Sequence, residues 1–422
     1  MIAIPLFRQS VEKALNPSFH RKEKIMLNRE AEVTLGRFEK YVYVWIVMCG
    51  VAGLLLGKFL PQFVRDINEL NVNGVSIPIA VLMFFLMYPT MAKVKLEELS
   101  HAVKNVGPTL TSLIANWIIA PPLMVLLAAL FLPNPDFRSG TILLGISPCT
   151  EMVLFWIAFS RGNVTQGVVI TAVNAVSTLL LYAPFASFYL GVGGVPVPFS
   201  LVSLSVLLFV GLPLIVGQCS KRILTSHKGE HWFTDRFLPV MNTLATAALL
   251  GMLVLLFSSE GQMILEHPLR VALIALPILL HFIFMLAGTH LVCWLLRYRY
   301  EEASMVSLIG SSTQFEVAIG TAMVVFGFGS GAALATVVGP LIEVPVMVTA
   351  TKLLKRTQPY FPRKVGSRLT SLYAPSVRIK QLFGVLIVLV TLYTVSALLG
   401  YSLHGVFNKL SSIWHCLSEC LP

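Results

Sequence analysis

Charged residues are scarce in this sequence. Asp, Glu, Lys and Arg together supply 12% of its 422 residues, whereas 56% are hydrophobic, and soluble domains average about a quarter charged residues. This composition excludes a soluble multi-domain protein, a disordered chain and a disulfide-rich secreted scaffold. The six cysteines form no CxxC pair, so neither a zinc site nor a disulfide framework is indicated. A GxxxxGKS/T loop is also lacking, so we expect neither ATP nor another cofactor.

Long apolar runs take the place of the missing charges. A helix needs about 20 apolar residues to cross the hydrocarbon core of a bilayer, so these runs predict an all-α integral membrane protein. The expected spans are 41–57, 74–92, 107–132, 140–159, 165–190, 198–217, 237–257, 271–296, 303–327 and 331–351, with an eleventh helix at 382–404.

The basic residues are distributed unevenly between the connecting segments. With the N-terminus in the cytoplasm, 26 of the 31 Lys and Arg residues fall on the cytoplasmic side, eight of them in the tail 1–40 and eight in the linker 352–381. Since membrane proteins retain basic loops in the cytoplasm, this asymmetry predicts ten core spans and a cytoplasmic N-terminus. The net charge of +11 therefore reports orientation in the bilayer and not a nucleic-acid partner.

Ten core spans divide into two halves of five, 41–190 and 198–351, followed by the linker, the eleventh helix and a tail at 405–422. An odd number of spans per half inserts the second half upside down relative to the first, as in many secondary transporters. Spans four and nine should then correspond. Both contain the pattern Gly-x-Ser-x-x-x-Glu, at Gly145, Ser147 and Glu151 and at Gly310, Ser312 and Glu316.

The matching stretches also carry signals of interrupted helices. Pro148 lacks an amide hydrogen and clashes with the preceding turn, and residues 310–313 (GSST) are poor formers of a helix interior. Unwound backbone is tolerated at membrane depth only where it lines a cavity or is buried by protein. The sequence therefore predicts one central polar site where spans four and nine cross. Its expected lining is Ser147, Cys149, Thr150 and Glu151 from one half and Thr313, Gln314 and Glu316 from the other, with Asn174 as a further candidate.

Three carboxylates fall inside the expected spans, namely Glu151, Glu316 and Glu343. An ionisable group at the bilayer centre costs at least about 2.5 kcal/mol, so each is a candidate for substrate binding or proton coupling. The alternative is a carboxyl group that only forms structural hydrogen bonds within the bundle. Asn116 and Asn174 also lie at bilayer depth, and we expect them to form hydrogen bonds across helices.

Cys149 follows Pro148 at the expected break. A helix N-terminus stabilises a thiolate, and thiolates bind soft ions and thiophilic metalloids. The alternative is that the thiol fills space as a small apolar group, which is how we interpret Cys49, Cys219 and Cys293. The flanking Ser147 and Thr150 and the nearby Glu151 favour a metalloid-binding role for Cys149.

These same residues carry a family resemblance. Residues 147–154 (SPCTEMVL), 315–319 (FEVAI) and 335–346 (ATVVGPLIEVPV) resemble segments of the arsenical resistance-3 type arsenite permeases, in the bile acid/arsenite/riboflavin transporter superfamily. The resemblance implies ten helices in two inverted repeats and export of trivalent arsenic, sometimes antimony. It also implies that Cys149 and Glu316 are required. Glu151 stands where the family commonly has a small residue, and Thr313 and Gln314 stand where it commonly has asparagines.

The leading hypothesis is a secondary exporter of arsenite in the plasma membrane, driven by proton antiport or by the membrane potential, with antimonite as a second candidate substrate. Cys149 would hold the metalloid, while Glu316, with Glu343 and Glu151, would carry protons. A sodium-coupled symporter of an organic anion is the alternative within the same fold. An intramembrane thiol hydrolase pairing Cys149 with His281 or His290, and a sensor that binds without flux, are further alternatives.

Overall fold

The computed structural model describes residues 42–72, 75–94, 106–150, 152–266, 268–327 and 329–362. These ranges cover both predicted five-helix halves, apart from residue 41 and short gaps at 73–74, 95–105, 151, 267 and 328. The predicted tail 1–40, the linker beyond residue 362, the eleventh helix 382–404 and the tail 405–422 lie outside the described residues.

In the described residues of the first half the chain folds into helices, with a short hairpin between α5 and α6. Its elements are α4 (Val42–Phe59), α5 (Pro61–Glu69), the antiparallel pair β1 (Asn71–Val72) and β2 (Val75–Ser76), α6 (Ile77–Lys93), α8 (Val106–Ile114), η2 (Ala115–Ile119), α9 (Ala120–Phe131), α10 (Pro135–Ile146), α11 (Met152–Phe159) and α12 (Val164–Val192). In the hairpin Asn71 pairs with Ser76.

The second half is helical as well. Its elements are α13 (Phe199–Val206), η3 (Leu207–Gly211), α14 (Leu212–Lys228), α15 (Glu230–Trp232), η4 (Phe233–Phe237), α16 (Leu238–Glu266), α17 (Pro268–Leu295), α18 (Tyr300–Ser311), α19 (Phe315–Phe326), α20 (Gly331–Thr357) and the 3-10 turn η5 (Gln358–Tyr360). Six helical stretches in the described part are long and apolar enough to cross a membrane: Val106–Phe131, Val164–Val192, Phe199–Lys228, Glu230–Ser259, Pro268–Leu295 and Gly331–Tyr360. The predicted all-α class is confirmed for this part of the chain.

Three long helices contain one wide turn each, and each wide turn precedes a proline. The π-helical segments η2, η3 and η4 come just before Pro121, Pro213 and Pro239. A proline ring clashes with the carbonyl group four residues earlier and donates no hydrogen bond to it. A π turn moves that carbonyl group out of the way, so the helix continues instead of breaking.

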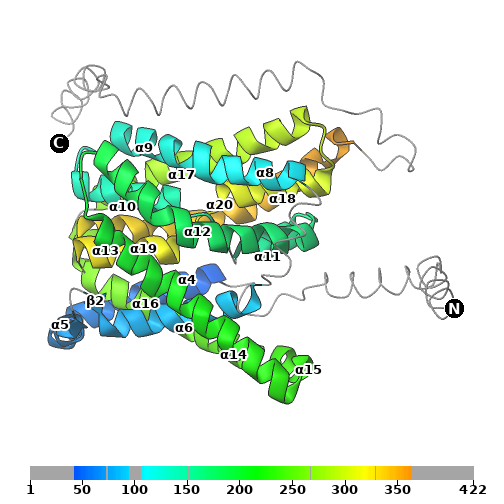
Figure 1. The fold of residues 1–422 in the computed structure, drawn as a ribbon. Coiled ribbons are helices and arrows are strands. Elements are labelled where there is room, and N and C mark those ends of the chain that lie inside the picture. Colours follow the sequence, from blue (N-terminus) through cyan, green and yellow to red (C-terminus); the bar gives the residue numbers. More distant parts are fainter. Residues whose placement is uncertain are drawn as a thin grey trace. The chain divides into compact units, whose positions relative to one another are not determined.

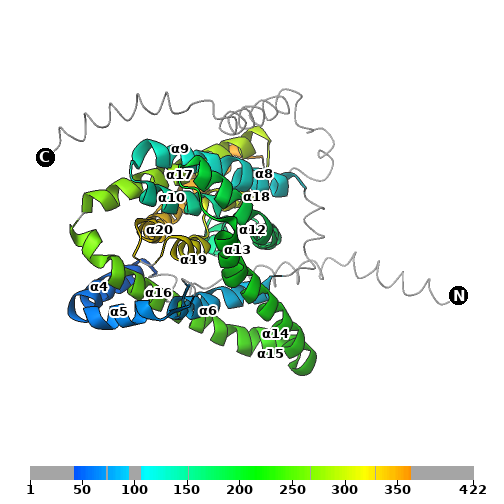
Figure 2. The ribbon, with the colours of Figure 1, turned by 60° about the vertical axis from the view of Figure 1, so that its left-hand side comes forward.

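The helices form two groups that contain members of both halves (Figures 1 and 2). In the first group α6 packs against α14 and α16, and α4 lies on α16. The second group contains α8 to α12 and α17 to α20, in which α10 packs on α9 and α20 and α17 packs on α9, α18 and α20. Both interrupted helical stretches, α10–α11 and α18–α19, belong to the second group.

Close approach within the second group depends on a small residue. A Cβ atom at Gly140 in α10 would overlap the backbone carbonyl oxygen of Ala332 in α20. The two backbones therefore come closer than any other residue at position 140 would allow, which is the packing mode expected between helices in a membrane.

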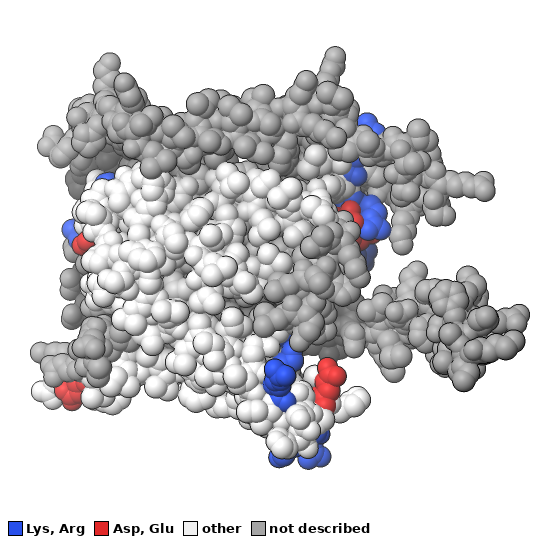
Figure 3. Space-filling model, viewed as in Figure 1, with Lys and Arg blue, Asp and Glu red and all other residues white. Residues whose placement is uncertain are grey.

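Large apolar side chains are exposed on the outer faces of the helices. They include Met48, Leu55, Leu180, Leu207, Ile215, Phe284 and Leu291. Figure 3 shows a wide face free of Lys, Arg, Asp and Glu, with charged residues gathered near the ends of the described helices. An apolar surface of this extent is unfavourable in water but suits contact with lipid.

Candidate functional site

Both predicted interruptions are present. In the first half α10 ends at Ile146 and α11 begins at Met152. In the second half α18 ends at Ser311 and α19 begins at Phe315. Pro148 lies in the first break, where its missing amide hydrogen and its clash with the preceding turn weaken the helix.

The two breaks lie against each other and satisfy part of each other's backbone. Pro148 and Thr313 form an isolated antiparallel β-bridge. The amide of Gln314 donates to the carbonyl of Ser147 at 2.8 Å, and the amide of Cys149 donates to the carbonyl of Ser312 at 3.4 Å. Without these bonds, the backbone groups freed by the breaks would be unpaired in an apolar interior. Each unpaired group would cost about as much free energy as a lost hydrogen bond.

Glu343 of α20 anchors the second break. One carboxylate oxygen accepts hydrogen bonds from Ser312 Oγ at 2.5 Å and from the Thr313 amide at 3.1 Å, and the other accepts from Thr313 Oγ1 at 3.0 Å. The Glu343 side chain is 4% exposed. Both of its oxygens are therefore occupied by donors from the break, and Glu343 does not belong to the cavity lining described below.

Asn174 of α12 holds the first break in a comparable way. Its Nδ2 donates to the carbonyl of Cys149 at 3.2 Å, and its Oδ1 accepts from Asn116 Nδ2 at 3.4 Å. The expectation that the two asparagines form hydrogen bonds across helices is confirmed. Each break is thus held by a polar side chain from the second helix that follows it in the sequence, α12 for the first break and α20 for the second.

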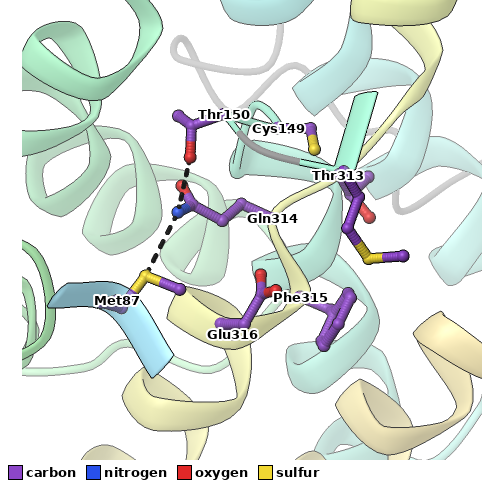
Figure 4. Close-up of a pocket in the computed structure, with 8 residues that line it drawn as sticks. Met87, Cys149, Thr150, Thr313, Gln314, Phe315 and Glu316 are labelled. Atoms are coloured by element: carbon purple, nitrogen blue, oxygen red, sulfur yellow. Dashed lines mark hydrogen bonds between the residues drawn. The ribbon is translucent and has the colours of Figure 1, made fainter. Parts of the chain in front are cut away.

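A small cavity lies where the breaks cross. Its lining residues are Met87, Cys149, Thr150, Met152, Thr313, Gln314, Phe315 and Glu316. Figure 4 shows the Gln314 side chain extended toward Thr150, with the Glu316 carboxyl group pointing toward Gln314. The volume free inside the cavity is on the order of that of one water molecule. A larger substrate therefore enters only when lining side chains move.

A thiol and a carboxyl group share this cavity. Cys149 is 4% exposed and Glu316 is 7% exposed. Both side chains line the cavity at the crossing of the breaks. Residues 149 and 316 come from opposite halves of the chain, so only the crossing of the breaks brings them together.

The structure brings five of the eight predicted substrate-binding residues into the cavity lining: Cys149, Thr150, Thr313, Gln314 and Glu316. Asn174 lies behind it and bonds the break backbone. Ser147 contributes its carbonyl oxygen to the Gln314 amide, and its buried hydroxyl has no hydrogen-bond partner among the described residues. Glu151 lies outside the described residues.

Sequence reasoning missed three lining residues, Met87, Met152 and Phe315. Met87 belongs to α6 and reaches the cavity from the other helix group. Methionines inside apolar spans resemble ordinary packing residues, so no sequence signal distinguished them. Met152 and Phe315 begin α11 and α19 directly after the breaks, and that position was the available signal.

The two span-eight histidines do not line the cavity. His281 Nε2 lies 3.2 Å from the Ala120 carbonyl oxygen. His290 bonds Ser307 Oγ at 3.0 Å and Thr357 Oγ1 at 2.9 Å. These bonds fit side chains that fasten helices together, and no contact observed among the described residues pairs either histidine with Cys149 for hydrolysis.

Comparison with known proteins agrees with this geometry. Residues 80–267 match the Sodium Bile acid symporter family. The chain is 41% identical over 350 residues to an uncharacterized transporter of Synechocystis, covering 78% of this chain and 91% of that protein. It is 36% identical to the arsenical-resistance protein Acr3 of Alkaliphilus metalliredigens, covering 78% of this chain and 95% of that protein. It is 34% identical to the Acr3 protein of Corynebacterium glutamicum, covering 74% and 86% of the two chains. The chain is therefore a multi-pass membrane transport protein and belongs to the Acr3-type permeases of arsenical resistance.

Proposed function

We propose that this protein is a secondary active exporter of arsenite at the plasma membrane. The observation that carries the proposal is the buried cavity that Cys149 and Glu316 share at the crossing of the two breaks. Two Acr3 arsenical-resistance proteins match most of the chain, which supports the same substrate. Antimonite, a trivalent hydroxide of the same chemistry, is a second expected substrate.

The cavity chemistry suits an uncharged metalloid hydroxide. Arsenous acid, As(OH)3, donates three hydrogen bonds, and trivalent arsenic binds sulfur. In the binding step an As–S bond to Cys149 forms and one As–O bond breaks. The thiol proton leaves with the released hydroxide as water, so the step needs no oxidant and no net proton. A single sulfur ligand permits release by the reverse reaction.

The lining also disfavours anionic substrates. Among the described residues it contains no Lys, Arg or His, while Glu316 and the Gln314 and Thr150 side chains offer oxygen atoms. An anion brought into a buried site without a cationic or metal partner loses its hydration without compensation. This composition favours a neutral donor such as As(OH)3 over an organic anion.

Glu316 is the proposed carrier of the coupling proton. It lines the cavity, whereas both oxygens of Glu343 are held by the second break. In this cycle, protonation of Glu316 accompanies release of the metalloid, and loss of that proton accompanies binding of the next metalloid. Proton entry is thereby coupled to arsenite export at one site. Glu151, at the corresponding position of the first half, is a further candidate, and the membrane potential is the alternative driving force.

The proposed membrane arrangement is ten helices in two inverted repeats, with the N-terminus in the cytoplasm. The sorting of helices supports it. The α4 and α6 helices of the first half share a group with α14 and α16 of the second, and the broken stretches α10–α11 and α18–α19 share the other group. Elements that a five-span repeat would relate therefore occupy the same group.

The decisive test is arsenite uptake into everted membrane vesicles, with and without an imposed proton gradient. We expect gradient-stimulated uptake by the wild-type protein, loss of uptake in Cys149→Ser, and loss of gradient dependence in Glu316→Gln. Cys293→Ser is the matched control, because Cys293 is equally buried and does not line the cavity. Uptake by Cys149→Ser vesicles equal to wild type would remove the proposed thiol role.

Sodium-coupled symport of an organic anion is the second candidate, favoured by the match of residues 80–267 to the Sodium Bile acid symporter family. It requires uptake that depends on a sodium gradient and is unaffected by Cys149→Ser. Right-side-out vesicles with an inward sodium gradient and a radiolabelled bile acid test it directly. This candidate would be rejected if the sodium gradient does not stimulate bile acid uptake by right-side-out vesicles while everted vesicles take up arsenite.

A further inference from the structure

Gln314 connects three elements at the cavity. It is the last residue of the break that precedes α19. Its side chain reaches Thr150 of the other break, where Gln314 Nε2 lies 3.1 Å from Thr150 Oγ1. The same Nε2 lies 3.5 Å from the thioether sulfur of Met87 in α6. Gln314 is 2% exposed, so its carboxamide is fixed between both halves of the chain and both helix groups.

The neighbours of this carboxamide set its orientation. A thioether sulfur accepts hydrogen bonds and cannot donate them, so the group that faces Met87 is the amide NH2. The carboxamide oxygen, Oε1, must then point elsewhere. This oxygen is buried and has no hydrogen-bond donor among the described residues, while Gln314 lines the cavity.

A buried acceptor without a donor costs about 1–3 kcal/mol. A ligand that brings a hydroxyl group into the cavity removes this cost, and a ligand that brings a methyl group instead leaves it in place. A site with a fixed acceptor therefore discriminates strongly against analogues that lack the matching donor.

We propose that Gln314 Oε1 accepts a hydrogen bond from a hydroxyl group of the bound arsenic and thereby selects arsenous acid over methylated arsenite. This inference rests on the proposed function. After exchange with the Cys149 thiol, arsenous acid keeps two hydroxyl groups, one for Glu316 and one for Gln314. Methylarsonous acid, CH3As(OH)2, keeps only one, so either Glu316 or Gln314 faces its methyl group.

The test compares uptake of the two arsenic species by everted vesicles at concentrations well below KM. The main variant is Gln314→Met, which has nearly the same length but no acceptor oxygen. We expect its preference for arsenous acid over methylarsonous acid to fall by about tenfold or more, the value of one hydrogen bond to a fixed group. The rate with methylarsonous acid should rise in absolute terms, because no acceptor is left unpaired beside the methyl group.

Two further variants separate recognition from folding. Gln314→Glu keeps an acceptor oxygen and should retain the wild-type preference. Ser203→Ala removes a hydroxyl that also has no partner among the described residues but does not line the cavity, and it should leave the preference unchanged. If Gln314→Met does not accumulate in the membrane, loss of preference in Gln314→Glu would still overturn the inference.

The outcomes distinguish this inference from the proposed function. Wild-type vesicles that accumulate neither arsenic species would refute arsenite export itself. Wild-type uptake of arsenous acid with the same preference in Gln314→Met would refute only the role of Gln314. A preference that shifts equally in Ser203→Ala would show that the change reflects general packing and would also overturn the inference.

Discussion

Replacing Glu343 tests whether this carboxylate holds the second break together. Its two oxygens accept three hydrogen bonds, from Ser312 Oγ, the Thr313 amide and Thr313 Oγ1. Hydrogen bonds to charged groups contribute about 1.5–3 kcal/mol each, and donors left buried and unpaired lose a similar amount. For three hydrogen bonds, Glu343→Leu should lower the free energy of unfolding by about 4.5–9 kcal/mol. This loss approaches the total stability of about 5–15 kcal/mol of a typical folded protein. We expect this variant not to accumulate in the membrane.

Glu343→Gln should lose much less stability than Glu343→Leu. The amide oxygen can still accept from Ser312 Oγ and the Thr313 amide, and the Thr313 hydroxyl can turn to accept from the new NH2 group. Neutral hydrogen bonds replace charged ones, so the expected loss is about 3 kcal/mol. Purified Glu343→Gln should melt roughly 5 °C or more below wild type and keep gradient-dependent arsenite uptake.

The assay is thermal unfolding of the detergent-purified proteins, together with vesicle uptake. Glu301→Gln is the matched control, because Glu301 is exposed at the start of α18 and should melt like wild type. A Glu343→Leu protein with wild-type abundance and melting temperature would refute the anchoring role. A Glu343→Gln protein that is stable but has lost its response to the proton gradient would instead identify Glu343 as a proton carrier.

Three further predictions concern the scaffold of the site. Asn174→Leu removes the hydrogen bond to the Cys149 carbonyl and the acceptor for Asn116. The variant should lose about 1–3 kcal/mol of stability and melt at a lower temperature than wild type. A wild-type melting temperature would contradict this. Gly140→Leu places side-chain atoms on the Ala332 carbonyl oxygen and should abolish accumulation of the protein in the membrane. Gly288→Ala is the control, because an added Cβ there meets nothing within 4 Å, and it should accumulate normally. Equal amounts of both variants would refute the close packing of α10 on α20. Arg138 donates hydrogen bonds to the carbonyls of Leu132, Pro133 and Gly193, so Arg138→Gln should destabilise the protein. Arg138→Lys should restore only part of the stability, because a lysine lacks the planar fork of donors. Wild-type stability of Arg138→Lys would show that charge alone matters.

Much of the candidate site was predictable because its signals are local. Pro148 removes a helical hydrogen bond and clashes with the preceding turn wherever the helix packs, and the run 310–313 weakens the second helix in a similarly intrinsic way. Scarcity of charge made Glu316 and Glu343 conspicuous, since an acid inside an apolar run costs free energy in any arrangement of helices. The apolar runs themselves gave the all-α class, because their length alone suits a membrane.

Only the tertiary structure decided which of these groups meet. Glu343 and Glu316 look alike in sequence, yet one is held by Ser312 and Thr313 while the other lines the cavity. Met87 enters the cavity from α6, and the orientation of the Gln314 carboxamide depends on that thioether. Gln314 and Met87 are 227 positions apart in the sequence, and Glu343 is 31 and 30 positions from Ser312 and Thr313. Local composition does not encode such contacts, because they form only when the packing of whole helices places the two side chains at the same depth.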